Sequence, residues 1–414
     1  MTQVLIVGGG LAGLACARTL SHAGMDCLIL EASDVVGGRA RTDQHEGFLL
    51  DRGFQVLLTA YPEAKRFLDY RALGLRRFVP GALVRAGNSF HRLADPLREP
   101  GDLLTTALSP LATLSDKLAI VQLWLRSGHS PAVQEFRQPE TTTLDFLVQR
   151  GFSPGFIDSF LRPFFGGIFL ERELRTSSRM FEFVFQMFAQ GYAALPWQGM
   201  GAMAKQLASR LPVDCVRLKV RVQKVVPKGV VLESGETLRA DAVVLATDPR
   251  NAARLLDQTH PESSRATACL YFAAPKPPIK DPILVLNGTD DGPVNHLCVP
   301  SVVSPSYAPS GSHLISANVV GSQGSQDASL AERVLLQMRK WFGRQVDSWR
   351  HLRTYYLPDA LPEQSPATGG VSHREVRLSG NLYVCGDHRD SASINGALAS
   401  GRRAAEAVMN DRIP

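Results

Sequence analysis

Hydrophobic residues occur along this chain in short continuous runs, and these runs alternate with segments whose apolar residues recur at the spacing of a helix. The run Val4–Val7 is followed by a glycine-rich turn and then by apolar residues at helical spacing between Leu11 and Leu20. A second apolar run, Cys27–Leu30, comes after this helix. Continuous apolar runs of this length are typical of strands that are buried on both faces, so the pattern predicts a parallel strand–helix–strand unit at the N-terminus.

The turn after the first run carries glycines at three positions with different requirements. Gly8 permits the tight turn, Gly10 lets the backbone approach a pyrophosphate, and Gly13 lets the helix pack closely on the strand. The free N–H groups at the start of the helix attract phosphates. The second run ends at Glu31, 18 residues beyond Gly13, where a carboxylate can accept hydrogen bonds from both ribose hydroxyls of an adenosine. The spacing therefore predicts a dinucleotide site.

Similar apolar runs return later in the chain. An alternating stretch, residues 216–226, leads through Gly229 into the apolar run 242–247, and a further strand, residues 381–385, precedes a helix that begins near Ile394. These segments predict that distant parts of the chain join the N-terminal strands in one doubly wound α/β sheet.

The segment after Glu31, Ala-Ser-Asp-Val-Val-Gly-Gly-Arg-Ala-Arg-Thr, resembles the one that follows the ribose-binding acid in FAD enzymes of the amine oxidase and phytoene desaturase superfamily. Residues 160–169, 195–207 and 355–362 extend the resemblance over most of the chain. It implies non-covalent FAD, a Rossmann-like FAD-binding domain of the glutathione reductase type, and an inserted α+β substrate domain. The expected FAD domain comprises residues 1–60, 196–250 and 363–414, and the expected substrate domain comprises residues 61–195 and 251–362.

The resemblance also implies roles for residues at both ends of the chain. Gly38 and Arg39 would pass beside the pyrophosphate, residues 51–56 would run beneath the isoalloxazine ring, and Asp387 would accept a ribityl hydroxyl. The helix from Ile394 would point its positive end at the flavin and stabilise negative charge in the reduced ring. The residues alone, without the resemblance, would indicate that Arg39 is an ordinary surface cation and that Gly386-Asp387 is an ordinary turn and helix cap. The expected cofactor-binding residues are Gly8, Gly10, Leu11, Ala12, Gly13, Glu31, Ala32, Gly38, Arg39, Gly53, Phe54, Gln55, Val56, Val222, Ala246, Thr247, Gly386, Asp387, Ser393, Ile394, Asn395 and Ala397.

The chain carries one glycine fingerprint, so a separate nicotinamide domain is not expected and the substrate itself would reduce the flavin. Ala268 stands where the amine oxidase branch usually has a lysine, which argues against amine oxidation. Residues 53–63 and 393–401 look most like carotenoid desaturases, carotene isomerases and squalene-associated flavoenzymes. This resemblance implies an FAD-dependent oxidoreductase that removes hydride from an apolar, isoprenoid- or carotenoid-like substrate, with oxygen or a quinone as the electron acceptor.

Three other functions stay open at this point. One is an amine or porphyrinogen oxidase of the same superfamily, another is a flavin-dependent carotene isomerase with no net redox change, and the third is an FAD-bound binding module without chemistry. The apolar segment Met180–Phe188 would line a substrate tunnel, although such a stripe is more often ordinary core. His388 is the candidate catalytic acid or base at the flavin edge, with a solvent-facing or capping histidine as the alternative. Arg162 and Asp390 are weaker candidates of the same kind.

Composition narrows the setting in which the protein works. Apolar residues make up 44% and charged residues 20% of the 414 positions, which excludes a disordered chain. The net charge of +6 is diffuse, so no nucleic-acid partner is expected.

Six scattered cysteines predict a reducing compartment and no metal site. The early strand at Val4 leaves no room for a signal peptide, so we expect a cytoplasmic protein. Asp116 and Lys117 interrupt the apolar stretch 103–125, which excludes a membrane span and leaves peripheral membrane contact open. The sequence does not predict the oligomeric state.

Overall fold

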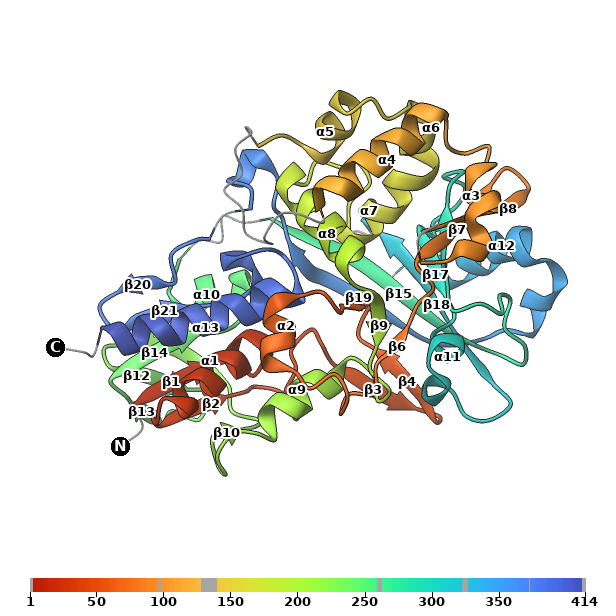
Figure 1. Cartoon of the computed structure of the whole chain (residues 1–414). Helices are drawn as coiled ribbons and strands as arrows, with labels where there is room; N and C mark the ends of the chain where they lie inside the picture. Colours follow the sequence, from red (N-terminus) through yellow and green to blue (C-terminus); the bar gives the residue numbers. More distant parts are fainter. Residues whose placement is uncertain are drawn as a thin grey trace.

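The computed structural model describes residues 3–95, 98–127, 140–258, 263–321, 327–371 and 373–411. Two large β-sheets lie side by side, and a layer of helices covers one end of the molecule (Figure 1). Both chain ends lie beside the first sheet (Figure 1). This arrangement confirms the predicted α/β class.

The first sheet has the strand order β10-β2-β1-β14-β21-β20. Its strands are β1 (Val4–Val7), β2 (Cys27–Leu30), β10 (Val216–Arg217), β14 (Ala242–Leu245), β20 (Arg377–Ser379) and β21 (Leu382–Val384). All neighbouring pairs are parallel except β20 and β21. The central strands are buried on both faces, which explains why their sequences are continuously apolar.

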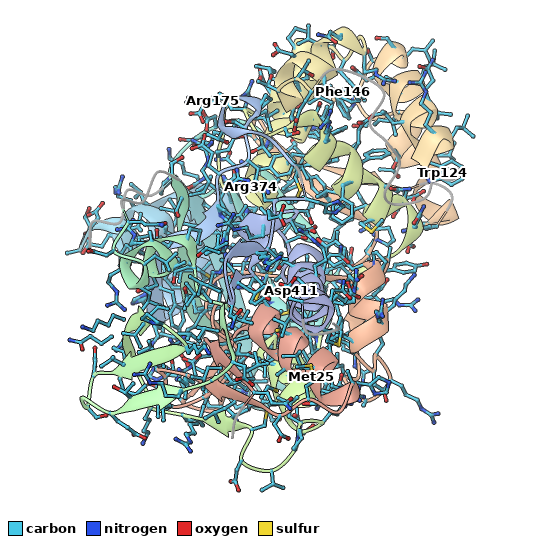
Figure 2. The ribbon with its side chains drawn as sticks, turned by 90° about the vertical axis from the view of Figure 1, so that its left-hand side faces the viewer. Met25, Trp124, Phe146, Arg175, Arg374 and Asp411 are labelled. Atoms are coloured by element: carbon cyan, nitrogen blue, oxygen red, sulfur yellow. The ribbon has the colours of Figure 1, made fainter. Side chains whose placement is uncertain are left out.

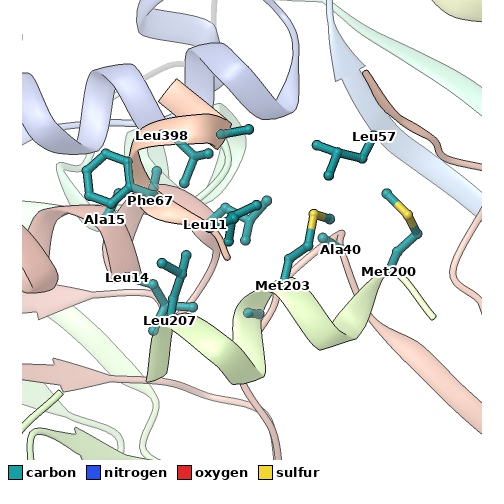
Figure 3. Packing of buried hydrophobic residues seen from close by; sticks show 14 of the residues in the cluster. Leu11, Leu14, Ala15, Ala40, Leu57, Phe67, Met200, Met203, Leu207 and Leu398 are labelled. Carbon is teal, nitrogen blue, oxygen red and sulfur yellow. The ribbon is translucent and has the colours of Figure 1, made fainter. Parts of the chain in front are cut away.

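Helices cover one face of this sheet and a small antiparallel sheet covers the other. The helices are α1 (Leu11–His22), α9 (Gly201–Ala208) and α13 (Ile394–Asn410). Their apolar side chains, among them Leu11, Met203 and Leu398, interlock in one cluster (Figure 3). The small sheet contains β11 (Val222–Val226), β12 (Gly229–Leu232) and β13 (Thr237–Arg239), and α10 (Pro249–Leu255) packs beside it. The predicted return of distant segments to the N-terminal strands is therefore confirmed.

The second large sheet has the order β19-β15-β18-β17-β16-β7-β8. Its strands are β7 (Gly81–Ala86), β8 (Ser89–Ala94), β15 (Ser264–Ala274), β16 (Leu284–Asn287), β17 (His296–Cys298), β18 (His313–Val320) and β19 (Arg350–Pro362). All neighbouring pairs are antiparallel except β7 and β16. The helix α12 (Leu330–Phe342) packs its apolar side against this sheet, and α11 (Pro300–Val303) lies between β17 and β18 along the chain.

The helical layer follows β8 in the chain. It contains α3 (Leu103–Ala107), α4 (Leu114–Ser127), α5 (Thr143–Gln149), α6 (Pro154–Phe156), α7 (Arg162–Phe169) and α8 (Ser178–Gln190). Phenylalanines from α5 to α8 form the centre of its core, with Phe165 and Phe181 at 4.5 Å between ring centroids.

Short elements join these parts. They are the hairpin β3 (Thr42–His45) and β4 (Phe48–Asp51), the three-stranded sheet of β5 (Leu57–Leu58), β9 (Ala193–Leu195) and β6 (Arg76–Arg77), and the helix α2 (Pro62–Phe67). An ion pair of 2.8 Å between Arg402 and Glu63 ties α2 to α13. The domain boundaries at residues 60, 195, 250 and 362 stay a prediction.

The helix α4 is apolar on two opposite faces. Its inner face buries Ala119 and Leu123, whereas Leu114, Leu118, Val121 and Leu125 are each at least half exposed and form one outer stripe. Trp124 lies beside this stripe at the outer edge of the helical layer (Figure 2). None of the helices in the described ranges is long and apolar enough to cross a bilayer.

Candidate functional site

A cavity of about 610 Å³ is lined by segments from the first sheet, the second sheet and the helical layer. Of the expected cofactor-binding residues, all except Gly13 and Asn395 line it. Gly13 instead packs α1 onto the turn, because a Cβ at this position would collide with the carbonyl oxygen of Gly8. The Asn395 side chain accepts a 3.0 Å hydrogen bond from the backbone N–H of Glu63 and so holds α2 against α13.

The glycine turn forms one end of the cavity. Gly8 has φ of +112°, and a Cβ there would lie 2.7 Å from the carbonyl oxygen of Ala246. Gly10, by contrast, has no atom within 4 Å of its Cβ position, so the backbone here faces open space. Gly10 also caps α1 without any side-chain hydrogen bond, which leaves the N–H groups of Leu11 and Ala12 facing the cavity. The turn therefore offers a positive, uncovered cradle for a pyrophosphate.

Glu31 lies at the carboxyl end of β2 and is buried. Its Oε2 atom accepts a 2.6 Å hydrogen bond from the backbone N–H of Gly9, and Oε1 accepts a 2.8 Å bond from that of Ser33. Each carboxylate oxygen has a second lone pair that can still accept a ribose hydroxyl. The two backbone bonds fix the carboxylate at the rim of the cavity, as the predicted ribose contact requires.

Arg39 joins the two ends of the chain at the cavity wall. Its guanidinium donates to Asp387 Oδ1 at 2.6 Å and to the carbonyl oxygen of Ala360 at 3.0 Å. Asp387 is buried and follows β21, whereas Arg39 follows β2. Arg39 thus fixes Asp387 beside Gly38, and both of these residues are expected cofactor contacts. The alternative that Arg39 is an ordinary surface cation is therefore wrong.

The segment after β4 forms the floor of the cavity at residues 53–56. Gln55 holds this segment by donating a 2.9 Å hydrogen bond to the carbonyl oxygen of Arg39. Asp51, the first residue of the segment expected beneath the ring, is a buried carboxylate to which the sequence assigned no separate role. Asp51 accepts hydrogen bonds from Thr42 Oγ1 at 2.5 Å, the N–H of Met200 at 2.9 Å and the Tyr307 hydroxyl at 2.8 Å. Burial raises its pKa to about 6 despite these bonds.

The helix α13 begins at the cavity. Ser393 caps it by accepting a 3.0 Å hydrogen bond from the N–H of Gly396, and Ser393, Ile394 and Ala397 line the cavity. The positive end of the helix dipole therefore faces the space above residues 53–56. This placement agrees with the predicted role of α13 in stabilising a reduced flavin.

The other end of the cavity is apolar. Met180, Val184 and Phe188 project from α8 at spacings of four residues and line it, as the tunnel hypothesis predicts. Further apolar lining residues come from α7, β16 and β19 and are Phe164, Ile168, Leu284 and Leu357. The described charged residues that line the cavity belong to the other end: Glu31, Arg39, Arg221, Asp248, Arg254 and Asp387.

The three candidate acid–base residues lie elsewhere. His388 is buried with its ring against Gly386, so the solvent-facing alternative is wrong, and it is absent from the described cavity lining. Arg162 pairs with Asp158 at 3.0 Å, and Asp390 pairs with Arg403 at 2.8 Å. A catalytic role for any of them stays a prediction.

Two polar residues on the second sheet, His296 and Asn318, line the cavity although no local sequence signal marks them. Each lies in a buried strand, and only the pairing of β17 with β18 places them side by side. Ala268, the position of the missing lysine, is fully buried on β15, and its neighbour Thr267 lines the cavity instead.

Comparisons with known proteins agree with this geometry. The family model of the flavin containing amine oxidoreductases matches residues 11–409. The chain is 24% identical to the coproporphyrinogen III oxidase of Propionibacterium freudenreichii subsp. freudenreichii, over 96% of this chain and 92% of that protein. It is also 24% identical to the hydroxysqualene dehydroxylase of Rhodopseudomonas palustris, over 98% of each protein.

Solved structures share the fold over nearly the whole chain. An oxidoreductase from Methanosarcina mazei has a TM-score of 0.78 at 18% identity, covering 99% of this chain and 100% of that one. The cyclohexylamine oxidase of Brevibacterium oxydans has a TM-score of 0.71 at 17% identity, covering 99% of both chains. The open glycine cradle, the Glu31 carboxylate at the cavity rim and the α13 terminus together fit the FAD that this family carries. The chain belongs to the flavin containing amine oxidoreductase family and is an FAD-dependent oxidoreductase.

Proposed function

We propose that the protein removes hydride from an apolar, isoprenoid-like substrate. The observation that supports this proposal is the division of the cavity, whose described charged lining residues surround the cofactor end. The other end is lined by α7 and α8 side chains such as Phe164, Val184 and Phe188. A long hydrocarbon gains free energy by leaving water for such a wall, whereas a charged amine needs an opposite charge that this wall lacks.

When bound, FAD would supply the hydride acceptor. The residues of this chain hold and orient the reacting partners. The N–H groups after Gly10 would hold the phosphates, Arg39 fixes Asp387 where it would meet the ribityl chain, and the start of α13 would favour the negative charge of the reduced ring. The α7 and α8 side chains exclude water and align the substrate over residues 53–56, which supports hydride transfer through proximity rather than through a strong base.

A porphyrinogen oxidase is the second candidate, because the coproporphyrinogen III oxidase similarity covers nearly the whole chain. A flavin-dependent isomerase without net redox change is the third. The lack of charge in the α7–α8 wall favours the isoprenoid over a carboxylated porphyrinogen, because each carboxylate would lose its hydration there without a partner.

We also propose that the outer stripe of α4 rests on a membrane that stores the substrate, with oxygen or a membrane quinone taking the electrons. Leu114 and Leu118 expose 73% and 55% of their surface, and the exposed cation Arg126 and the half-buried Lys117 lie on the same helix. Anionic headgroups would pair with these cations while the leucines enter the interface. The inner face of α4 packs on α8, so the membrane side lies directly over the apolar wall of the cavity.

The test is an anaerobic titration of the holoprotein in which the visible flavin bands report reduction. Isoprenoids in liposomes, a porphyrinogen and soluble amines are added in separate cuvettes. Bleaching by the isoprenoids alone is the expected result, and bleaching by amines or the porphyrinogen alone would overturn the proposal. An isomerase would convert its substrate only after the flavin has been reduced, and without further bleaching.

A pair of variants links the titration to the cavity wall. Val184→Glu places a charge in the wall and should abolish bleaching by isoprenoids without loss of FAD. Val148→Glu makes the same change at a position on α5 that is 59% exposed, and it should behave as the wild type. Equal loss in both variants would mean that the wall does not contact the substrate.

A further inference from the structure

A polar pair interrupts the otherwise apolar substrate end of the cavity. His296 on β17 lies directly opposite Asn318 on β18 in the antiparallel register, so their side chains share one face of the sheet. Both line the cavity, and the His296 ring lies 5.3 Å from that of Phe54 on the cavity floor.

The neighbours of His296 determine which ring nitrogen carries the proton. The Asn295 side-chain amide donates a 2.8 Å hydrogen bond to the carbonyl oxygen of Pro163 and lies 3.1 Å from His296 Nδ1. A carbonyl oxygen can only accept, so the amide nitrogen must face this pair, and His296 Nδ1 accepts its second proton. The His296 proton therefore resides on Nε2. Burial also lowers the pKa of His296 to about 4, which keeps the ring neutral at pH 7.

Asn318 supplies the complementary group. Its side-chain nitrogen donates a 3.2 Å hydrogen bond to Ser316 Oγ on the same strand, which leaves the Asn318 oxygen as an acceptor. Thr267, the next polar residue along this wall, donates its hydroxyl to the carbonyl oxygen of Val319 at 3.0 Å. The wall thus presents one donor, His296 Nε2, beside one acceptor, Asn318 Oδ1.

We infer that His296 and Asn318 bind a hydroxyl group on an otherwise apolar substrate. A hydroxyl accepts one hydrogen bond and donates another, so it satisfies both side chains, whereas a hydrocarbon satisfies neither and leaves two buried polar groups unpaired. This inference takes the apolar class of substrate from the proposed function. It adds that the substrate carries a hydroxyl group where it meets His296, and it does not depend on which bond of the substrate is oxidised.

The test measures binding of farnesol and of farnesene, which differ chiefly in the hydroxyl. Both are supplied from methyl-β-cyclodextrin to the oxidised holoprotein, and their affinities are measured by equilibrium dialysis. The wild type should bind farnesol at least about tenfold more tightly than farnesene, as expected for a hydrogen-bonded neutral hydroxyl. His296→Leu should lose this preference, and Asn318→Leu should reduce it from the opposite strand. His351→Leu is the matched control, because His351 lies on β19 of the same sheet but outside the described cavity lining.

Equal affinity for the two ligands in the wild type, absence of farnesol binding, or an unchanged preference in His296→Leu would overturn the inference. A changed flavin spectrum in His296→Leu with an unchanged preference would also overturn it, since His296 would then act on the cofactor. A preference for farnesol without bleaching would support the polar pair and count against hydride removal from such substrates. The two proposals therefore fail by different readouts.

Discussion

Replacing Asp51 by Asn should stabilise the protein at pH 8 more than at pH 5. Asp51 is buried, and its pKa rises from the ordinary value of 3.8 to about 6. The folded state therefore binds the proton more tightly than the unfolded state. This contribution to stability is fully present below pH 3.8 and is lost as the pH rises through 6. The whole effect is roughly 3 kcal/mol, and about 1.4 kcal/mol of it falls between pH 5 and pH 8.

The substitution preserves the hydrogen bonds as well as the shape. The Asn oxygen can accept from Thr42 and Met200, and the amide nitrogen can donate to the Tyr307 hydroxyl, which then accepts instead of donating. Asn does not ionise, so the free energy of unfolding of the variant does not depend on pH through this residue. The wild type, by contrast, loses stability through Asp51 as the pH rises through 6. The melting temperature of Asp51→Asn relative to the wild type should thus rise by about 1.5–2 °C between pH 5 and pH 8, given an unfolding entropy of about 2.1 cal/mol/K per residue.

Differential scanning calorimetry with saturating FAD at both pH values provides the measurement. Asp43→Asn is the control, because burial would raise the pKa of Asp43 but its bonds with Arg52 and Tyr355 lower it. Asp43 therefore changes stability only below its ordinary pKa of 3.8, and the difference between Asp43→Asn and the wild type should be nearly equal at pH 5 and pH 8. The reasoning would be refuted if the melting temperature of Asp51→Asn relative to the wild type were equal at the two pH values or higher at pH 5.

Three other predictions concern the cofactor and the membrane. Gly8→Ala should abolish FAD binding, because the new Cβ would lie 2.7 Å from the Ala246 carbonyl oxygen, and the flavin absorbance of the purified protein measures this loss. Gly24→Ala is the control and should retain the flavin, because Gly24 has φ of +74° but faces open space. Arg39→Ala should weaken FAD at least about tenfold in calorimetric titration, since Asp387 loses a charged partner, and unchanged affinity would contradict this role. Leu118→Ser should reduce sedimentation with anionic liposomes about tenfold, whereas Leu336→Ser, a leucine on α12 that is 60% exposed, should not; equal sedimentation of both variants would count against contact through α4.

The sequence predicted the cofactor end of the cavity because its signals are local. The residues between Val4 and Glu31 form a strand, a turn and a helix whose geometry depends on near neighbours, and Gly8 has a steric requirement that no other residue meets. The same holds for the strand and helix around Asp387. Those motifs also revealed the fold, since a β-α-β unit with a carboxylate at its second strand has few alternatives.

The substrate end was harder to predict because it depends on pairing over long distances. His296 and Asn318 become neighbours through the register of β17 and β18. His388 illustrates the limit of such local signals, because it follows Asp387 in sequence but is absent from the described cavity lining. Gly386 turns the chain there with φ of +147°, and the His388 ring folds back against it. The burial of Asp51 likewise arises from Tyr307, which comes from a distant part of the chain.

The central position of β1 sets the order of events during synthesis of the protein. This strand is synthesised well before its partner β14, which ends at Leu245, and the cavity wall closes only when residues 386–397 have joined it. The nascent chain must therefore keep its N-terminal apolar strand unpaired on that side while more than half of the protein is translated. The described lining of the FAD site is complete only after α13 has been synthesised, so docking of this helix is the step that closes the site.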